Sequence, residues 1–144
     1  EKAMGNKGKV TGIGGVFFKS DNPTDLRRWY NERLGLDAGE YGMTFFWREQ
    51  HQDNVGYSVW NPFRSSTDYF APSPEPFMVN FRVEHLEELL EELRSAGVEV
   101  VGEIAQEPNG KFAWILDPDG NKLELWEPVP SKEDPYLNPP DNEG

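Results

Sequence analysis

One carboxylate occupies an unusual position in the segment DPDGNKLELWEP (117–128). Side chains alternate between the two faces of a β-strand, so Lys122, Glu124 and Trp126 share one face, opposite Leu123 and Leu125. A glutamate next to a tryptophan on one face is unusual in a core and typical of a strand that lines a pocket. Glu124 is therefore a candidate general base or a hydrogen-bond acceptor for a ligand. The alternative is an internal ion pair with a nearby cation.

The other reactive side chains restrict the chemistry further. The sequence contains no cysteine, which excludes disulfides, thiolate metal sites and a cysteine nucleophile. Its two histidines, His51 and His85, fall in a predicted loop and at a predicted helix start. The glycines at 12, 14 and 15 lie within a predicted strand that no helix directly follows, so they do not form a phosphate-binding motif.

Length and charge exclude several classes of protein. The 144 residues suffice for one compact domain, or for two small halves that share a core. A net charge of −12 would repel phosphate backbones, so we expect no nucleic-acid partner. No stretch approaches the roughly 20 apolar residues of a membrane span, and no apolar signal segment opens the sequence. We therefore expect a cytoplasmic protein without a membrane partner.

The hydrophobic pattern divides the chain into two halves of similar plan. Residues 1–9 are predicted to be a flexible N-terminal segment. In the first half, 10–63, a strand over 10–18 precedes a helix that starts at Asn22 and Pro23 and stops at Gly35. Strands over 43–49 and 55–61 follow, joined by a hairpin with the sequence QHQDN.

A Pro- and Ser-rich connector, 64–76, leads to the second half, 77–128. A strand over 77–83 precedes an amphipathic helix with leucines at 86, 89, 90 and 93 on one stripe. Further strands are predicted over 98–104, 111–116 and 121–126. The tail, 129–144, is rich in proline and acidic residues and is predicted to lack regular structure.

Two short segments indicate that this plan repeats. SVWNP (58–62) closes the first half, and ELWEP (124–128) closes the second. One βαβββ unit alone would leave a sheet face bare, so the halves are expected to pack together. The predicted fold is α+β, with two βαβββ modules that form a curled eight-stranded mixed sheet around a shared cleft and place the helices outside.

This plan resembles the vicinal oxygen chelate superfamily, which includes glyoxalase I, extradiol dioxygenases and bleomycin resistance proteins. The resemblance covers residues 10–128, and its most specific segments are DPDGNKLELWEP, WYNERLGL and FRVEHLEELLEELRSAGVEV. Metal-dependent members place four ligands in the cleft, two from each half. Carried over position by position, these slots fall on Gly14, Ser58, Met78 and Glu124. Only Glu124 suits a divalent ion, so we expect neither a metal site nor another cofactor.

The same carry-over places further side chains in the cleft by strand alternation. The face that holds Gly14, Met78 and Glu124 also takes Val16, Phe18, Asn80, Arg82, Lys122 and Trp126. The repeat adds Trp60, and the neighbouring strand adds Phe112 and Trp114. We predict Glu124 as the catalytic candidate and the following ligand-binding residues: Phe18, Trp60, Met78, Asn80, Arg82, Phe112, Trp114 and Trp126.

Arg82 has two possible roles. Arg82 fits a carboxylate or phosphate on a ligand, because its guanidinium is a planar fork. Alternatively, Arg82 or Lys122 forms an internal ion pair with Glu124.

An aromatic cup with few polar groups predicts that the protein binds a small molecule. The first hypothesis is a glyoxalase/bleomycin-resistance-like protein that binds a small, partly aromatic ligand without the family metal. The second is a lyase, isomerase or dioxygenase-type enzyme that uses Glu124 as base or as metal ligand. The third is a structural module whose own side chains fill the cleft. The resemblance also implies a homodimer.

Overall fold

The computed structural model describes residues 8–48 and 55–139, so the predicted QHQDN hairpin and His51 lie outside the described residues. The elements are β1 (Lys9–Ser20), α1 (Pro23–Leu34), β2 (Met43–Arg48), β3 (Val55–Arg64), β4 (Phe77–Glu84), α2 (Leu86–Ser95), β5 (Ala105–Glu107), β6 (Gly110–Leu116), β7 (Lys122–Pro128) and the 3-10 helix η1 (Ser131–Glu133). Neither α1 nor α2 is long and apolar enough to cross a membrane.

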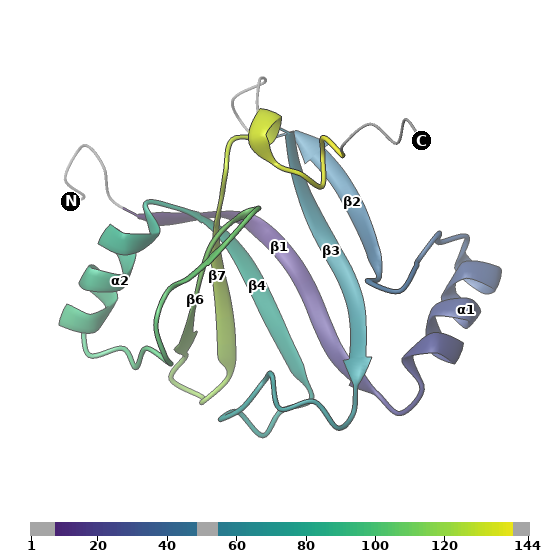
Figure 1. The fold of residues 1–144 in the computed structure, drawn as a ribbon. Helices are drawn as coiled ribbons and strands as arrows, with labels where there is room; N and C mark the ends of the chain where they lie inside the picture. The colour runs from purple at the N-terminus through teal and green to yellow at the C-terminus, as the bar shows by residue number, and fades with distance from the viewer. Residues whose placement is uncertain (1–7, 49–54, 140–144) are drawn as a thin grey trace.

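The strands form one mixed sheet in the order β2-β3-β1-β4-β7-β6-β5. The central pair, β1 and β4, is antiparallel, while β1 pairs with β3, and β4 with β7, in parallel. The two helices lie at opposite ends of this sheet (Figure 1). The α+β class is confirmed.

The described residues form seven strands, whereas the sequence predicts eight. Two strands follow α1 and three follow α2. The predicted strand over 98–104 is wrong: this segment makes one isolated bridge, from Val100 to Ile115, and β5 begins only at Ala105. Gly102 interrupts the strand because its φ of 74° lies in the left-handed region.

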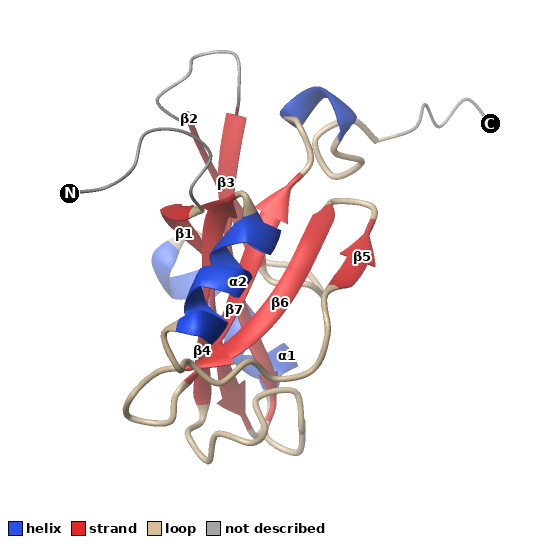
Figure 2. Cartoon of the chain, turned by 90° about the vertical axis from the view of Figure 1, so that its left-hand side faces the viewer, coloured by secondary structure: helices blue, strands red, loops and turns tan. Residues whose placement is uncertain are grey.

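The main core lies between α2 and the strands of the second half (Figure 2). Leu86 and Leu90 of α2 are almost fully buried, and they belong to one cluster with Val83, Ala113, Ile115 and Leu125. These side chains define the helix face of the sheet. Because side chains alternate along a strand, Asn80, Glu124 and Trp126 occupy the opposite face, the cleft face.

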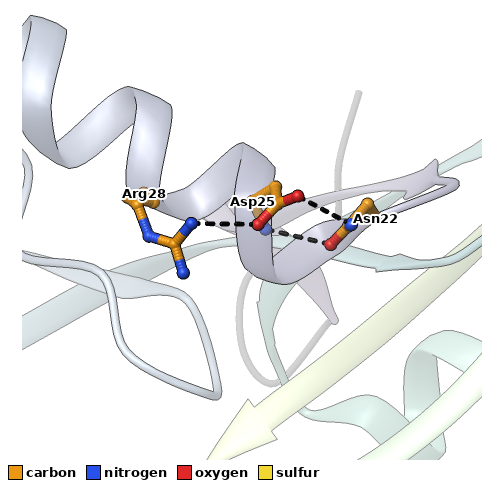
Figure 3. Close-up of polar contacts among 3 residues, drawn as sticks. All are labelled: Asn22, Asp25 and Arg28. Carbon is orange, nitrogen blue, oxygen red and sulfur yellow. Dashed lines mark hydrogen bonds and ion pairs between the residues drawn. The ribbon is translucent and has the colours of Figure 1, made fainter.

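Helix α1 has a complete N-terminal cap. Asn22 Oδ1 accepts a hydrogen bond of 3.0 Å from the backbone N–H of Asp25, and Asn22 Nδ2 donates one of 2.8 Å to the Asp25 carboxylate. Arg28 pairs with the same carboxylate at 3.1 Å (Figure 3). No residue of α1 is buried. Its main ring contact with the sheet is Tyr30 on Trp60, with ring centroids 4.6 Å apart.

A β-bulge at Gly14 changes the phase of β1. Ile13 pairs with Phe81 and Gly15 with Asn80, so Gly14 is an extra residue on β1. Gly14 faces the cavity described below, but beyond the bulge it is Phe17 that lies on the cleft face, opposite Met78. Val16 and Phe18 therefore lie on the helix face, and their predicted place in the cleft is wrong.

The tail after β7 packs back onto the sheet. Beyond η1, Asp134 is 1% exposed. Its Oδ2 accepts a hydrogen bond of 2.6 Å from the hydroxyl of Tyr57 on β3, and its Oδ1 accepts one of 2.8 Å from the backbone N–H of Tyr136. The segment 131–138 is thus ordered by these contacts, contrary to the prediction that the tail lacks regular structure.

Candidate functional site

A cavity of about 640 Å³ opens on the cleft face of the sheet. Strands from both halves form its walls, together with the connector before β4 and the tail. Most of the walls are aromatic, and the rings nearest the sheet are Phe17, Tyr57, Phe63, Tyr69, Phe112 and Trp126. Small-molecule pockets have volumes of roughly 300–1,000 Å³, apolar walls and a few polar groups. The cavity matches that description.

Glu124 lines this cavity and is 4% exposed. Its Oε1 accepts a hydrogen bond of 2.6 Å from Asn80 Nδ2. Its Oε2 accepts one of 2.9 Å from Trp114 Nε1 and another from the hydroxyl of Tyr69. All three donors are neutral side chains. These hydrogen bonds compensate the carboxylate for its burial, in the place of the predicted ion pair.

Strand register brings two of these donors to Glu124. On β7, Glu124 lies directly opposite Asn80 of β4 and directly opposite Trp114 of β6. Residues opposite each other in adjacent strands share a face, so all three side chains point to the cleft face. The third donor, Tyr69, comes from the connector and is 37% exposed.

Burial shifts the pKa values of two neighbours of Glu124. Burial raises the pKa of the Tyr69 hydroxyl, and the charge of Glu124 and the hydrogen bond to it raise it further. Burial lowers the pKa of Lys122, although Glu124 and Asp68 oppose this shift. The ammonium of Lys122 donates a hydrogen bond of 2.7 Å to the backbone carbonyl of Tyr69. Lys122 therefore holds the connector against the cleft.

Arg82 is buried within a group of aromatic rings. Its guanidinium carbon lies 4.8 Å from the ring centroid of Trp126, 5.2 Å from that of Trp47 and 5.6 Å from that of Tyr57. Such contacts stabilise a cation through the ring quadrupoles. Arg82 is not among the residues that line the cavity, so it is not placed to receive an anionic group of a ligand there.

Contacts between the tail and the sheet complete one wall. Burial raises the pKa of Tyr57, and the hydrogen bond to the Asp134 carboxylate raises it further. The ring of Tyr57 contacts that of Trp126 at 5.2 Å, edge to face. Trp126 Nε1 donates a hydrogen bond of 3.0 Å to the backbone carbonyl of Asn109. The walls of the cavity are therefore fixed by hydrogen bonds as well as by packing.

The structure brings several of the predicted site residues together. Glu124, Asn80, Phe112 and Trp126 line the cavity, and Trp114 donates to Glu124. Phe112 and Trp126 stack with an interplanar angle of 3°. Met78 is fully buried and does not line the cavity.

Two of the predicted site residues lie on the wrong face for the cleft. The cavity is lined by Tyr57, Val59, Asn61 and Phe63 of β3. Trp60 therefore lies on the helix face, where it contacts Phe18, with centroids 5.6 Å apart, and Tyr30 of α1. The repeat of SVWNP and ELWEP predicts the wrong phase, because equal spacing in the sequence does not require the same face of the sheet. Phe18 fails for a different reason, the bulge at Gly14.

Several residues of the cavity are missing from the sequence prediction. Tyr69 lies in a connector without periodic structure, where no pattern indicates the direction of a side chain. Tyr136 lies in a tail that the sequence predicts to be solvated. Asp134, in the same tail, does not line the cavity but holds Tyr57 in its wall. Tyr57 and Phe63 are strand residues that correct phasing of β3 would have identified.

The residues at the four metal slots of the vicinal oxygen chelate plan do not fit a divalent ion. Gly14 offers no side chain, and Met78 does not line the cavity. Ser58 donates to the carbonyl of Ile13 and accepts from Trp47 Nε1 at 2.9 Å. Glu124 already accepts three hydrogen bonds. Across 8–48 and 55–139, no three His, Cys, Asp or Glu side chains gather as ligands would.

Comparisons with known structures agree on the fold. A methylmalonyl-CoA epimerase from Mycobacterium tuberculosis is 21% identical, over 85% of this chain and 91% of that chain, with a TM-score of 0.54. A Streptomyces coelicolor methylmalonyl-CoA epimerase variant in complex with 2-nitronate-propionyl-CoA is 13% identical, over 84% and 96%, with a TM-score of 0.62. The Mn(II)-bound glyoxalase from Novosphingobium aromaticivorans is 18% identical, over 83% and 40%, with a TM-score of 0.56.

At these identities the likeness concerns the fold alone. No curated protein matches the sequence. The sequence model of the Glyoxalase/Bleomycin resistance protein/Dioxygenase superfamily, however, matches residues 13–125, which is most of the chain. The chain therefore belongs to the glyoxalase/bleomycin resistance protein/dioxygenase superfamily.

Proposed function

We propose that this protein binds a small, partly aromatic molecule in the cavity on the cleft face, without the family metal. The observation that carries the proposal is the aromatic wall around a single buried carboxylate, Glu124. Flat rings such as Phe112, Trp126 and Phe63 favour a flat ligand, because stacked and edge-to-face ring contacts stabilise by about 0.5–1.5 kcal/mol each. Glu124 and Asn80 supply the polar end that orients the ligand.

The direct test is a binding panel with a matched pair of variants. Aromatic amines, phenols, aromatic acids and hydrophobic antibiotics are titrated by calorimetry and by thermal shift, and at least one class should bind. Val59→Phe places a ring in the cavity from β3 and should abolish that binding. Leu34→Phe adds a ring at an exposed position of α1 outside the cavity and should leave it unchanged. A flat response across the panel would refute the proposal.

An enzyme remains the second candidate, because the carboxylate of Glu124 faces the cavity. A carboxylate has about four acceptor positions, and three are used by Asn80, Tyr69 and Trp114. The fourth is open to a proton of a bound substrate or to a metal ion. Calorimetric titration with Mn²⁺, Zn²⁺ and Ni²⁺ separates the candidates. Stoichiometric binding that Glu124→Gln abolishes would favour a metal enzyme over a metal-free binding protein.

We also propose that the protein is a homodimer, as the family resemblance implies. The helix face of the first half exposes apolar side chains that a second copy can cover, including Val16 and Phe45. Light scattering after size exclusion should give twice the chain mass, and Phe45→Lys should shift it to that of one chain. A monomeric wild type would contradict this. A cytoplasmic location and the lack of nucleic-acid and membrane partners remain predictions from composition.

A further inference from the structure

We infer that the ligand of this cavity brings a hydrogen-bond donor, an N–H or O–H group next to its aromatic ring, to the acceptors Asn80 Oδ1 and Glu124. The inference rests on the proposed function and narrows its ligand class to aromatic amines, phenols and related donors. Ethers and carboxylates of the same ring system should bind more weakly. Three features of the cavity support this: the orientation of the Asn80 amide, the space that Gly14 leaves beside it and the charge of the walls.

The orientation of the Asn80 amide follows from its neighbour. An ionised carboxylate only accepts hydrogen bonds, so the amide nitrogen must face Glu124, to which it donates at 2.6 Å. The amide oxygen then points away from Glu124. Asn80 is 3% exposed, and no described residue donates a hydrogen bond to this oxygen. A buried acceptor without a donor costs about 1–3 kcal/mol.

A glycine leaves space for that oxygen at the edge of the cavity. A Cβ built on Gly14 would lie 2.0 Å from Asn80 Oδ1 and 3.0 Å from Trp126 Cε3. Any other residue at the bulge would therefore displace the amide. Gly14 and Asn80 both line the cavity, so the unpaired acceptor lies in its wall, although the oxygen itself is buried. A ligand donor reaches it only by entering the space beside Gly14.

The donor groups of the cluster are directed at Glu124. Asn80, Tyr69 and Trp114 each donate to its carboxylate. Among the described residues that line the cavity, Glu124 is the only acid, and none is a lysine, arginine or histidine. A carboxylate on the ligand would meet the like charge of Glu124, while the nearest cations, Arg82 and Lys122, lie behind the lining residues. A phenol O–H can donate to one of these two acceptors, and an amine with two or more N–H groups can donate to both.

Three naphthalenes of the same size test the inference: 2-naphthol, 2-methoxynaphthalene and 2-naphthoate. The first carries a donor, the second only an acceptor and the third a negative charge. In calorimetric titrations, 2-naphthol should bind about tenfold more tightly than the ether, as expected for a hydrogen bond to a charged group. The naphthoate should bind more weakly than both.

A matched pair of glycine variants adds a second readout. Gly14→Ala places a methyl group against Asn80 Oδ1 and should reduce the preference for naphthol over ether to about twofold or less. Gly39→Ala adds the same methyl where no atom lies within 4 Å, and it should keep the wild-type preference. Glu124→Gln should also weaken the rejection of naphthoate.

The possible failures are distinguishable. Equal affinity of the wild type for naphthol and its ether would overturn the donor requirement and leave the proposed function intact. Tight binding of naphthoate would do the same. No heat from any of the three compounds, together with a flat response to the wider panel, would count against the proposed function itself.

Discussion

The two helices of this protein contribute very differently to its stability. Helix α2 buries Leu86 and Leu90 in a cluster with three strands of the second half. Helix α1 buries nothing, and its Trp29 and Leu34 are 51% and 61% exposed. The second half thus has a conventional core between helix and sheet, whereas in the first half the almost fully buried Tyr57 lies on the other face, the cleft face.

This difference couples the first half to the cavity. On the cleft face, Phe17 contacts Phe63 with centroids 5.2 Å apart, and Tyr57 contacts both Trp126 and Asp134. These side-chain contacts of β1 and β3 on the cleft face are therefore also part of the walls of the site. The second half serves as a platform, and a ligand in the cavity should stabilise the first half more than the second.

The largest expected effect separates the two helices by the same substitution. Leu90→Ala should lower the free energy of unfolding by about 2–5 kcal/mol, because it opens a cavity in the core under α2. Leu34→Ala, on the exposed side of α1, should change it by about 0.5 kcal/mol or less. Urea unfolding at 25 °C measures both. Equal losses would show that α1 is packed as tightly as α2.

The second-largest expected effect is a loss of folding stability at alkaline pH, which arises from two tyrosines on the cleft face. The pKa values of Tyr57 and Tyr69 are raised above the ordinary value of 10.0, so the folded chain keeps both protons when the unfolded chain has lost them. Stability from these groups is complete below pH 10 and falls as the pH rises above it. Lys122 acts in the opposite direction, because its pKa is lowered. Thermal melts from pH 8 to 12 should show a net fall that Tyr57→Phe reduces.

A smaller effect should follow from separating the tail from β3. Asp134→Ala leaves the buried hydroxyl of Tyr57 without its acceptor, which should cost about 1–3 kcal/mol. Asp134→Asn keeps an acceptor at the same place and should cost less. Chemical unfolding ranks the two variants. If both equal the wild type, the tail does not support the first half.

The smallest expected effect concerns the cap of α1. Asn22→Ala removes the acceptor for the backbone N–H of Asp25, which typically costs about 1 kcal/mol when a helix is well packed. Because α1 buries no side chain, the loss should appear as fraying of the helix. Amide hydrogen exchange should accelerate in α1 and stay unchanged in α2. Protection that is lost in both helices would contradict the contrast between the halves.

The sequence predicts the second half better than the first, for a physical reason. The leucine stripe of α2 and the alternation in β4, β6 and β7 are periodic signals, and they identify Asn80, Phe112 and Trp126 as cleft residues. In the first half, one extra residue at Gly14 reverses the phase of β1, and alternation has no means of detecting it. Tyr69 belongs to a connector, where the direction of a side chain depends on tertiary contacts alone. Gly102 shows that an apolar run also needs a compatible backbone to become a strand.

The inserted glycine in β1 affects how the residues of this cavity are aligned with those of related proteins. Deleting that single residue would make Ile13 and Gly15 neighbours whose partners, Phe81 and Asn80, are already consecutive. The strand would then be regular, and Phe17 would keep its place on the cleft face. Residue roles on the two sides of this point can therefore pass between relatives only with a gap placed there. Without that gap, simple alternation assigns the wrong face to every residue beyond the bulge.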